Sequence, residues 1–264
     1  MKKIKKIIEI LKSYVLMEKN TKLVVLGHHK TGTTAIASLL AHAADLSISG
    51  DPIYEMSPSS SSLLDTLLND TDSFVKIVKA NPRFFFQQVV KEPDYILSID
   101  EIFKLYPYSK FVFIIREPHQ IIRSIFNRLS IEGTTELHKI PYENLSNSTS
   151  NWEYIVNGSP KISDSLTVVE RLAWRIEKTT LSYLKYSNKI QLIKYEDFIK
   201  NKSQYIKEIL DKIEMPCPKS ISNIEDKQFQ PKGDHKVLIN DFFGKENYNL
   251  ITNICDKTIK SFNY

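Results

Sequence analysis

Cysteine is nearly missing from this sequence of 264 residues, which contains only Cys217 and Cys255. The two lack the spacing of a metal site or a redox motif, and so few thiols predict a reducing compartment, the cytoplasm. Long apolar runs are also missing at the start, because lysine and glutamate interrupt residues 1–20 and exclude a signal peptide or a membrane span there. Residues 1–20 predict an amphipathic helix packed on the domain, with weak contact to a membrane surface as the alternative.

A large excess of one charge is absent too, since 36 Lys and Arg stand against 31 Asp and Glu, a net charge of +5. This modestly basic balance suits an anionic ligand but is too small to indicate nucleic acid as a partner. The hydrophobic share of 42% and charged share of 25% are typical of a globular protein. The length fits one α/β domain or two small ones.

The clearest motif follows the apolar run Leu23–Leu26, which predicts a buried parallel strand. It reads Gly27-His28-His29-Lys30-Thr31-Gly32-Thr33-Thr34 and leads into a run of helix formers. In such a strand–turn–helix unit, backbone N–H groups and the positive end of the helix dipole point at one spot. Lys30 adds a positive charge, and Thr33 and Thr34 add hydroxyl groups. The stretch predicts a phosphate-binding loop.

This loop departs from the nucleotide-binding pattern G-x-x-x-x-G-K-S/T, because Thr33 stands where the lysine belongs and Lys30 precedes the second glycine. It resembles the loop of sulfotransferases that use 3′-phosphoadenosine 5′-phosphosulfate (PAPS), Pro/Arg-Lys/Arg-Ser/Thr-Gly-Thr-Ser/Thr, except for the histidine at its first position. The resemblance implies that the 5′-phosphosulfate contacts the whole segment, His29, Lys30, Thr31, Gly32, Thr33 and Thr34. Taken alone, the loop is also consistent with an ordinary strand–turn–helix whose lysine faces solvent.

A second apolar strand, Lys110–Ile115, ends in Arg116-Glu117-Pro118 and leads into a helix that contains Ser124. A guanidinium binds phosphate in bidentate fashion, and a hydroxyl farther along the helix can complete the site. The pattern resembles the 3′-phosphate motif of the same family, which implies that Arg116 and Ser124 bind the 3′-phosphate. A P-loop kinase would usually carry an acidic residue here to hold Mg²⁺. Arginine instead argues against metal-dependent phosphoryl transfer, and no metal site is indicated.

Three weaker motifs follow the family's order along the chain. Lys91-Glu92-Pro93 ends a short strand and resembles the Lys-x-Pro form found in protein-tyrosine and many bacterial sulfotransferases. Tyr195-Glu196-Asp197-Phe198 resembles the family's Tyr-Glu motif, which implies that Tyr195 lies near the adenine. Lys232, in Pro231–Lys236, is faintly similar to the basic segment that closes over the cofactor in some members.

The predicted fold is a single α/β domain over residues 21–264, with a central, mostly parallel sheet flanked by helices, as in the P-loop-like sulfotransferase fold. Residues 47–58 predict an irregular loop, and residues 130–163 a lid or substrate-facing loop with Trp152 and Tyr154 as acceptor contacts. A functionally silent insertion is the alternative for the second loop. The long helix predicted over residues 164–186 places Trp174 in the core.

The resemblance implies transfer of a sulfuryl group from PAPS to a hydroxyl or amine of an acceptor, leaving 3′,5′-ADP, without a metal. Lys30 would stabilise the charge that develops on the bridging oxygen, and Lys91 would bind the sulfuryl oxygens. The general base of the Lys-x-His enzymes is missing. Asp51, after Gly50, takes the place of the glutamate that protein-tyrosine sulfotransferases use, and its rivals are Glu55, Glu92 and His28.

Two other functions compete with this interpretation. One is a P-loop kinase with a degenerate loop, and the other is a domain that binds an adenosine phosphate, or a partner, without turnover. Nothing in the sequence selects the acceptor among carbohydrates, lipids, peptides and small natural products.

Overall fold

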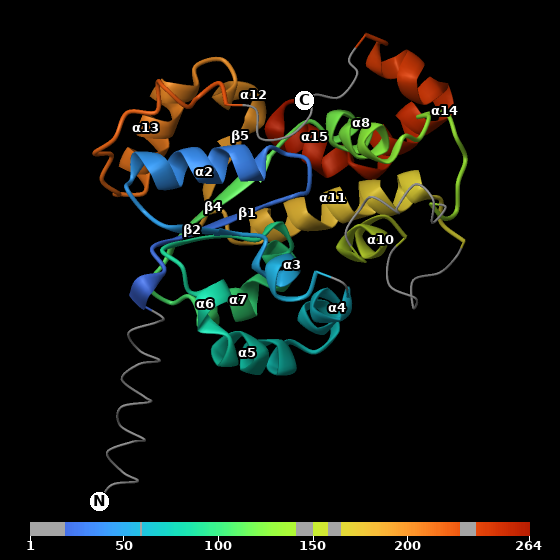
Figure 1. Cartoon of the computed structure of the whole chain (residues 1–264). Coiled ribbons are helices and arrows are strands. Elements are labelled where there is room, and N and C mark those ends of the chain that lie inside the picture. The colour runs from blue at the N-terminus through green and yellow to red at the C-terminus, as the bar shows by residue number, and fades with distance from the viewer. Residues whose placement is uncertain (1–18, 59, 141–149, 158–164, 228–235) are drawn as a thin grey trace, which may run out of the picture.

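The computed structural model describes residues 19–58, 60–140, 150–157, 165–227 and 236–264. At their centre lies a five-stranded sheet of order β2-β3-β1-β4-β5, in which every neighbouring pair is parallel (Figure 1). The strands are β1 (Leu23–Gly27), β2 (Ile48–Gly50), β3 (Val89–Lys91), β4 (Lys110–Ile115) and β5 (Gln191–Lys194). The predicted α/β fold is confirmed, with a wholly parallel sheet.

The burial of the two central strands, β1 and β4, explains why their sequences are nearly continuous apolar runs. Every residue of β1 is buried, and so is every residue of β4 after Lys110. Alternate side chains enter two separate cores, Leu23 and Val25 on one face of the sheet and Val24 and Leu26 on the other. A parallel strand covered on both faces needs apolar residues at both alternating sets of positions.

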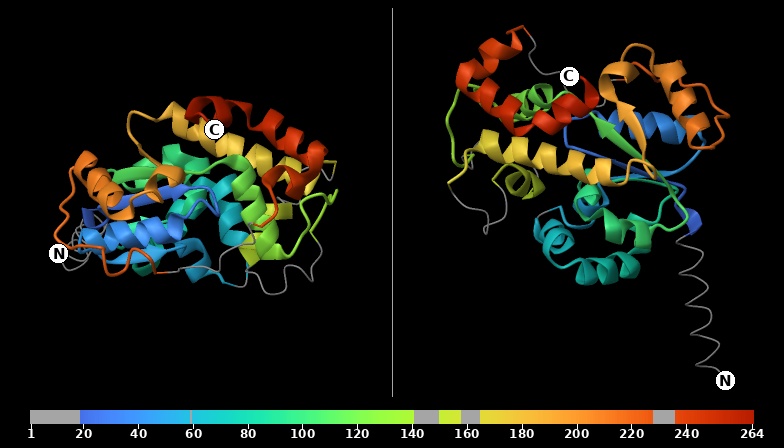
Figure 2. Two further views of the ribbon diagram at one scale, coloured as in Figure 1. Left: turned by 90° about the horizontal axis from the view of Figure 1, so that it is seen from above. Right: turned by 180° about the vertical axis from the view of Figure 1, so that it is seen from behind.

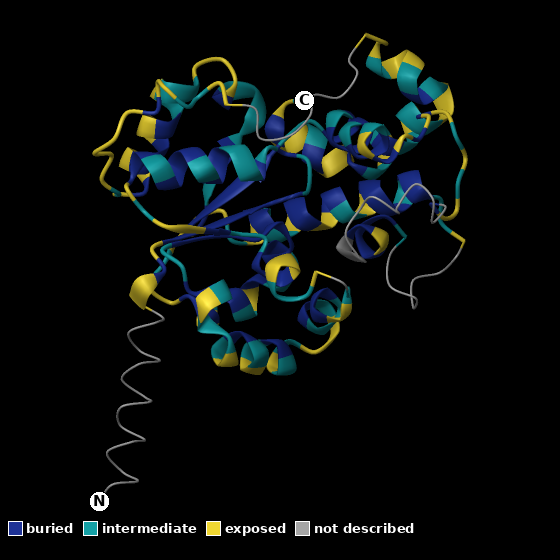
Figure 3. Ribbon diagram, viewed as in Figure 1, coloured by how far each residue is buried: buried dark blue, intermediate teal, exposed yellow. Residues whose placement is uncertain are grey.

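Helices cover the two faces unequally. One face carries α2 (Thr33–Ala43), α12 (Tyr195–Phe198) and α13 (Lys202–Lys212). The larger core on the other face lies under α3 (Pro52–Met56), α4 (Ser62–Asn69), α5 (Thr71–Ala80), α6 (Pro82–Phe85), η1 (Pro93–Ser98), α7 (Ile99–Leu105), α8 (Pro118–Leu129), α10 (Ser150–Asn157), α11 (Val168–Lys185), α14 (Ile239–Ile254) and α15 (Asp256–Phe262). Figure 2 shows α14 running along α11, and Figure 3 shows the buried residues following the strands and the inner faces of the helices. Burial of these apolar faces is the main force that holds the layers together.

Residues 47–58 do not form the irregular loop that the sequence predicts. They contain the edge strand β2 and the short helix α3. Backbone pairing with β3, in register from Ile48 with Val89 to Gly50 with Lys91, makes the strand, and this pairing partner lies 41 residues away. A three-residue strand has too little apolar pattern of its own to be recognised.

Two further expectations differ from the structure. Trp174 is 53% exposed rather than in the core, because Leu172, Ala173 and Ile176 occupy the buried side of α11. The segment 130–163, expected as a loop, contains α10, while its parts 141–149 and 158–163 lie outside the described residues.

Two predictions concern residues that the structure does not describe. The amphipathic helix predicted for residues 1–20 lies outside it except for Lys19 and Asn20, and Lys232 lies outside it as well. Among the helices that are described, none combines the length and the apolar character needed to cross a membrane.

Candidate active site

The carboxyl ends of the five strands lie at one edge of the sheet, and each is followed or ended by a residue that the sequence singles out. In the spatial order of the strands, these are Asp51 after β2, Lys91 at the end of β3, the loop with Lys30 after β1, Arg116 after β4 and Tyr195 after β5. Open parallel sheets bind their ligands at this edge. The fold therefore gathers residues from 51 to 195 around a single loop.

Glycine is required at both ends of that loop. Gly32 caps α2 with a φ of 85°, and a Cβ placed there would lie 2.8 Å from Cε2 of Tyr195. A Cβ on Gly27 would lie 2.9 Å from the carbonyl oxygen of Ile114. Between them, the Thr31 hydroxyl donates to the carbonyl of His28 at 2.8 Å and tightens the turn. The backbone is thus held close to the start of α2, as an anion-binding turn requires.

Lys30 lies close to two other positive charges, those of Arg128 and Arg116. Burial, and then the nearby charges of Arg128 and Arg116, lower the pKa of its ammonium to about 8. Arg128 lies on α8 one helical turn beyond Ser124, so both occupy the same face of that helix. Sequence reasoning missed Arg128, although the spacing of four residues from Ser124 was a signal that could have found it.

Arg116 faces the lysine-bearing loop. Its Nη1 donates to the carbonyl oxygen of Lys30 at 3.2 Å, and its guanidinium carbon lies 4.6 Å from the centre of the Tyr195 ring. Ser124 is half-buried on α8 and makes no hydrogen bond to Arg116 within the described residues. The arginine, the loop and the tyrosine therefore form one contiguous surface.

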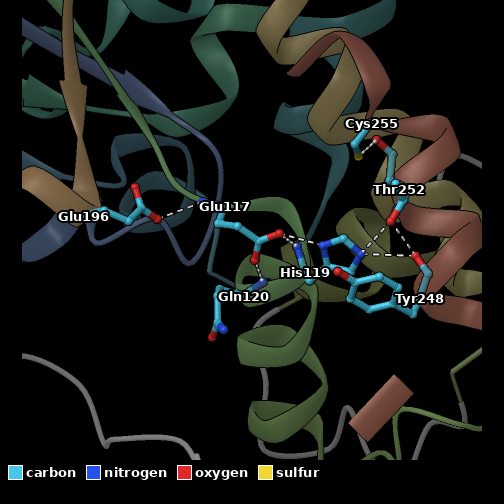
Figure 4. A network of polar contacts seen from close by, with 8 residues as sticks. Glu117, His119, Gln120, Glu196, Tyr248, Thr252 and Cys255 are labelled. Carbon is cyan, nitrogen blue, oxygen red and sulfur yellow. Dashed lines mark hydrogen bonds and ion pairs between the residues drawn. The ribbon is translucent and has the colours of Figure 1, made fainter. Parts of the chain in front are cut away.

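The turn that carries Arg116 is anchored from both sides, as Figure 4 shows. The carboxylate of Glu117 accepts hydrogen bonds from the first backbone N–H groups of α8, those of His119 and Gln120. The backbone N–H of Glu117 donates to the carboxylate of Glu196 at 2.9 Å. His119 also stacks on Tyr248 of α14, with ring centres 4.2 Å apart. The capping carboxylate and the stacked histidine fix the direction of the chain between the end of β4 and the start of α8.

On the other side of the loop, Lys91 is held in a buried polar cluster. Its side chain is 2% exposed, forms an ion pair with Asp51 and donates to the Thr34 hydroxyl at 3.4 Å. The backbone N–H of Asp51 in turn donates to the carbonyl of Lys91 at 2.8 Å. Asp51 is 39% exposed, so this carboxylate joins the buried ammonium to the surface.

The rivals of Asp51 as a base occupy different environments. Burial, and then the charges of Asp51 and Asp94, raise the pKa of Glu92 well above its usual range. Glu55 is exposed, and its carboxylate accepts a hydrogen bond from the hydroxyl of Ser49. Burial, and then Arg175, lower the pKa of His28 to about 3, so this imidazole is held neutral in the interior.

His29 has partners that the sequence did not reveal. Its Nε2 lies 3.1 Å from Oδ2 of Asp94, and Asp94 is also paired with Arg175 of α11. The ring of Trp152 lies 5.6 Å from His29, and Arg128 lies 5.3 Å from the same indole. Helix α10 thus rests directly against the loop through Trp152, which is buried.

Tyr154, the other residue expected to contact an acceptor, lies elsewhere. Its hydroxyl donates to Asp65 of α4 at 3.4 Å. In the part of the chain that the structure describes, no group of three or more His, Cys, Asp or Glu residues could hold a metal ion.

The sequence and the fold both resemble those of known proteins. The model of the sulfotransferase family matches residues 56–219, which is more than half of the chain. The chain belongs to the sulfotransferase family. The matched segment contains Lys91, Arg116, Ser124 and Tyr195, but it begins after the loop that carries Lys30.

Solved sulfotransferase structures share the fold of this family member. Sulfotransferase STF9 from Mycobacterium avium superposes with a TM-score of 0.60 at 12% identity, over 92% of this chain and 77% of that one. Sulfotransferase STF1 from Mycobacterium tuberculosis H37Rv gives 0.52, also at 12% identity, over 92% and 78%. At such low identity the likeness concerns the fold alone. No curated protein matches the sequence significantly.

Proposed function

We propose that this protein transfers the sulfuryl group of PAPS to a hydroxyl or amine of an acceptor and releases 3′,5′-ADP. The observation that carries the proposal is the contact between Arg116 and the backbone of Lys30. It brings the arginine that follows β4 and the loop that follows β1 close enough for one nucleotide to reach both. The 5′ and 3′ anionic groups of a single adenosine donor can then be bound together.

The residues at this edge fit such a donor. The loop from His29 to Thr34 would hold the 5′-phosphosulfate through its amides, hydroxyls and the Lys30 ammonium. Arg116 and Ser124 would bind the 3′-phosphate, Tyr195 would lie beside the adenine, and Lys232 remains a proposed closing contact. The lowered pKa of Lys30 supports this fit, because burial and the charges of Arg128 and Arg116 disfavour its ammonium and a bound anion would offset them.

The donor supplies an activated sulfuryl group, and the protein supplies positioned charge. Lys30 and the loop amides would stabilise the oxygen that gains negative charge, and Lys91 would bind the sulfuryl oxygens from the side of β3. The ion pair with Asp51 keeps Lys91 aimed at the start of α2, next to Thr34. The resemblance puts Asp51 forward as the proton acceptor, although a proton on its carboxylate would break the ion pair with Lys91. This division of roles requires no metal.

The acceptor is proposed as a carbohydrate, lipid, peptide or small natural product, and the scarcity of cysteine keeps the cytoplasm as the proposed location. Neither a nucleic acid partner nor membrane insertion forms part of the proposal.

Thermal unfolding of the full chain tests the proposed donor. We expect 3′,5′-ADP to raise the unfolding temperature in the absence of metal, and ATP with Mg²⁺ to raise it less. Stabilisation by ATP with Mg²⁺ alone would favour a degenerate kinase. Stabilisation by 3′,5′-ADP with no transfer of ³⁵S from labelled PAPS to any acceptor in a broad panel would favour a binding domain without turnover.

A further inference from the structure

His29 is connected to a charged pair that ties the loop to two distant elements. Its Nε2 lies 3.1 Å from Oδ2 of Asp94 on η1, and the other oxygen of that carboxylate is bound by Arg175 on α11. Asp94 is only 6% exposed. Burial alone would raise the pKa of Asp94, but Arg175 and then His29 outweigh it and hold the pKa well below its usual range. The carboxylate beside His29 is therefore ionised.

An ionised carboxylate next to one ring nitrogen selects the tautomer of the histidine. Nε2 must carry the hydrogen in order to donate to Asp94, which leaves Nδ1 with a lone pair. Within the described residues Nδ1 makes no hydrogen bond, and the His29 side chain is 18% exposed. In the described residues the lone pair of Nδ1 is thus left for a ligand, and the side chain that carries it is partly exposed.

The position of His29 suits a role in proton transfer. It immediately precedes Lys30 in the loop, and Asp94 follows Lys91 by three residues at the end of β3. The histidine therefore belongs to the same loop as Lys30, and its carboxylate partner follows the strand that ends in Lys91. Trp152 packs beside its ring and shields it from solvent on one side.

The other candidates are less suited to accept a proton. His28 and Glu92 are buried, at 3% exposure each. Asp51 is accessible, but a proton on its carboxylate would break the ion pair that holds Lys91. His29 is the accessible base whose protonation strengthens an existing contact, because an imidazolium binds the Asp94 carboxylate more tightly.

On the basis of the proposed function, we infer that His29 accepts the acceptor's proton and that Asp94, held by Arg175, positions it. The acceptor O–H bond breaks as its oxygen forms the new bond to sulfur, and the bond between sulfur and the bridging oxygen of the donor breaks. The proton goes to Nδ1 of His29, the leaving oxygen departs with 3′,5′-ADP, and the histidine later returns the proton to water. For an amine acceptor the same nitrogen takes the N–H proton.

The first test reads the tautomer and needs no turnover. In full-length protein labelled with ¹⁵N-histidine and saturated with 3′,5′-ADP, we expect His29 in the Nε2–H form. Asp94→Asn should remove that preference while the protein still binds 3′,5′-ADP. A hydrogen on Nδ1 in the wild type, or a spectrum unchanged in Asp94→Asn, would overturn the inference.

The second test is chemical rescue, with ³⁵S-labelled PAPS as donor and 2-naphthol as surrogate acceptor, or water where 2-naphthol does not react. His29→Ala should lower kcat by about 100-fold or more, because general-base catalysis is typically worth that much. Free imidazole should restore a substantial part of kcat in His29→Ala and none in Asp51→Asn. The remote variant His42→Ala should behave as the wild type.

The binding of 3′,5′-ADP separates the ways in which the idea can fail. His29→Ala, and His29→Gln as a second variant, should bind 3′,5′-ADP nearly as the wild type does. If kcat is retained in both and lost in Asp51→Asn, the base is Asp51 and the inference is wrong, while the proposed function stands. If the wild type itself does not bind 3′,5′-ADP, the proposed function fails first.

Discussion

The two halves of the site are built in different ways. Around β1, β4 and β5, the loop, Arg116 and Tyr195 touch through backbone atoms and ring faces, and each directly follows its own strand. Around β2 and β3, Lys91 depends on the side chain of Asp51, and Asp94 pairs with His29 of the loop. Under the proposed function, the first half would bind the nucleotide and the second would hold the reacting groups. Substitutions should therefore separate nucleotide binding from sulfuryl transfer.

Lys30 belongs to both halves, so its loss should have the largest effect. We expect Lys30→Ala to lower transfer by about 100- to 1,000-fold, as removal of a group that stabilises developing charge typically does. The measurement is the rate of ³⁵S transfer from labelled PAPS. Lys104→Ala, an exposed lysine paired with Glu101, is the matched control. Transfer within threefold of wild type would remove Lys30 from the chemistry.

Lys91 should affect the reacting half alone. Lys91→Ala is expected to lower transfer by about 100-fold, with no change in the affinity for 3′,5′-ADP, because this product has no sulfuryl group. Calorimetry with 3′,5′-ADP and the transfer assay check the two parts. A parallel loss of nucleotide affinity would show that the two halves are not separate.

Arg116 should give the opposite result. Loss of a charged hydrogen bond costs about 1.5–3 kcal/mol, so Arg116→Ala should weaken 3′,5′-ADP by about 10- to 100-fold. The affinity for 5′-AMP should fall much less, since it has no 3′-phosphate. The control is Arg83→Ala, because the Arg83 guanidinium packs over the ring of Phe84, away from the site. Equal losses for the two nucleotides would contradict the 3′-phosphate role.

The smallest effect concerns pH. The pKa of Lys30 in the free protein is lowered to about 8, and an ammonium is charged below its pKa. The affinity for 3′,5′-ADP should therefore fall as the pH rises above 8, by at most about tenfold per pH unit. Titrations from acid to alkaline pH would show the fall, and Lys30→Arg should lack it because a guanidinium stays charged. The same fall in Lys30→Arg would assign it to another group.

The first half was largely predictable from sequence. Leu23–Leu26 and Lys110–Ile115 are largely apolar runs, and the candidate site residues follow them directly. Such local units keep their shape because the strand, the turn and the following helix impose it. Arg128 was missed only because no motif extended that far along α8.

The second half was predicted in its residues but not in its contacts. Lys91 and Asp51 were named, yet β2, the strand that brings them together, was expected to be part of an irregular loop. His29 was recognised as a loop residue only. Its partners lie 65 residues away at Asp94 and, from Asp94, 81 residues further at Arg175, with nothing in the local pattern to join them.

What the sequence alone determined is the set of strand–turn units and their order along the chain, because periodicity and turn chemistry act over a few residues. What only the tertiary structure decided is which charges meet: Lys91 with Asp51, and His29 with Asp94 and Arg175. Those pairs form because parallel pairing aligns the strand ends and the long helix α11 packs across them. Charge pairing across such distances depends on the packed core and leaves no local trace in the sequence.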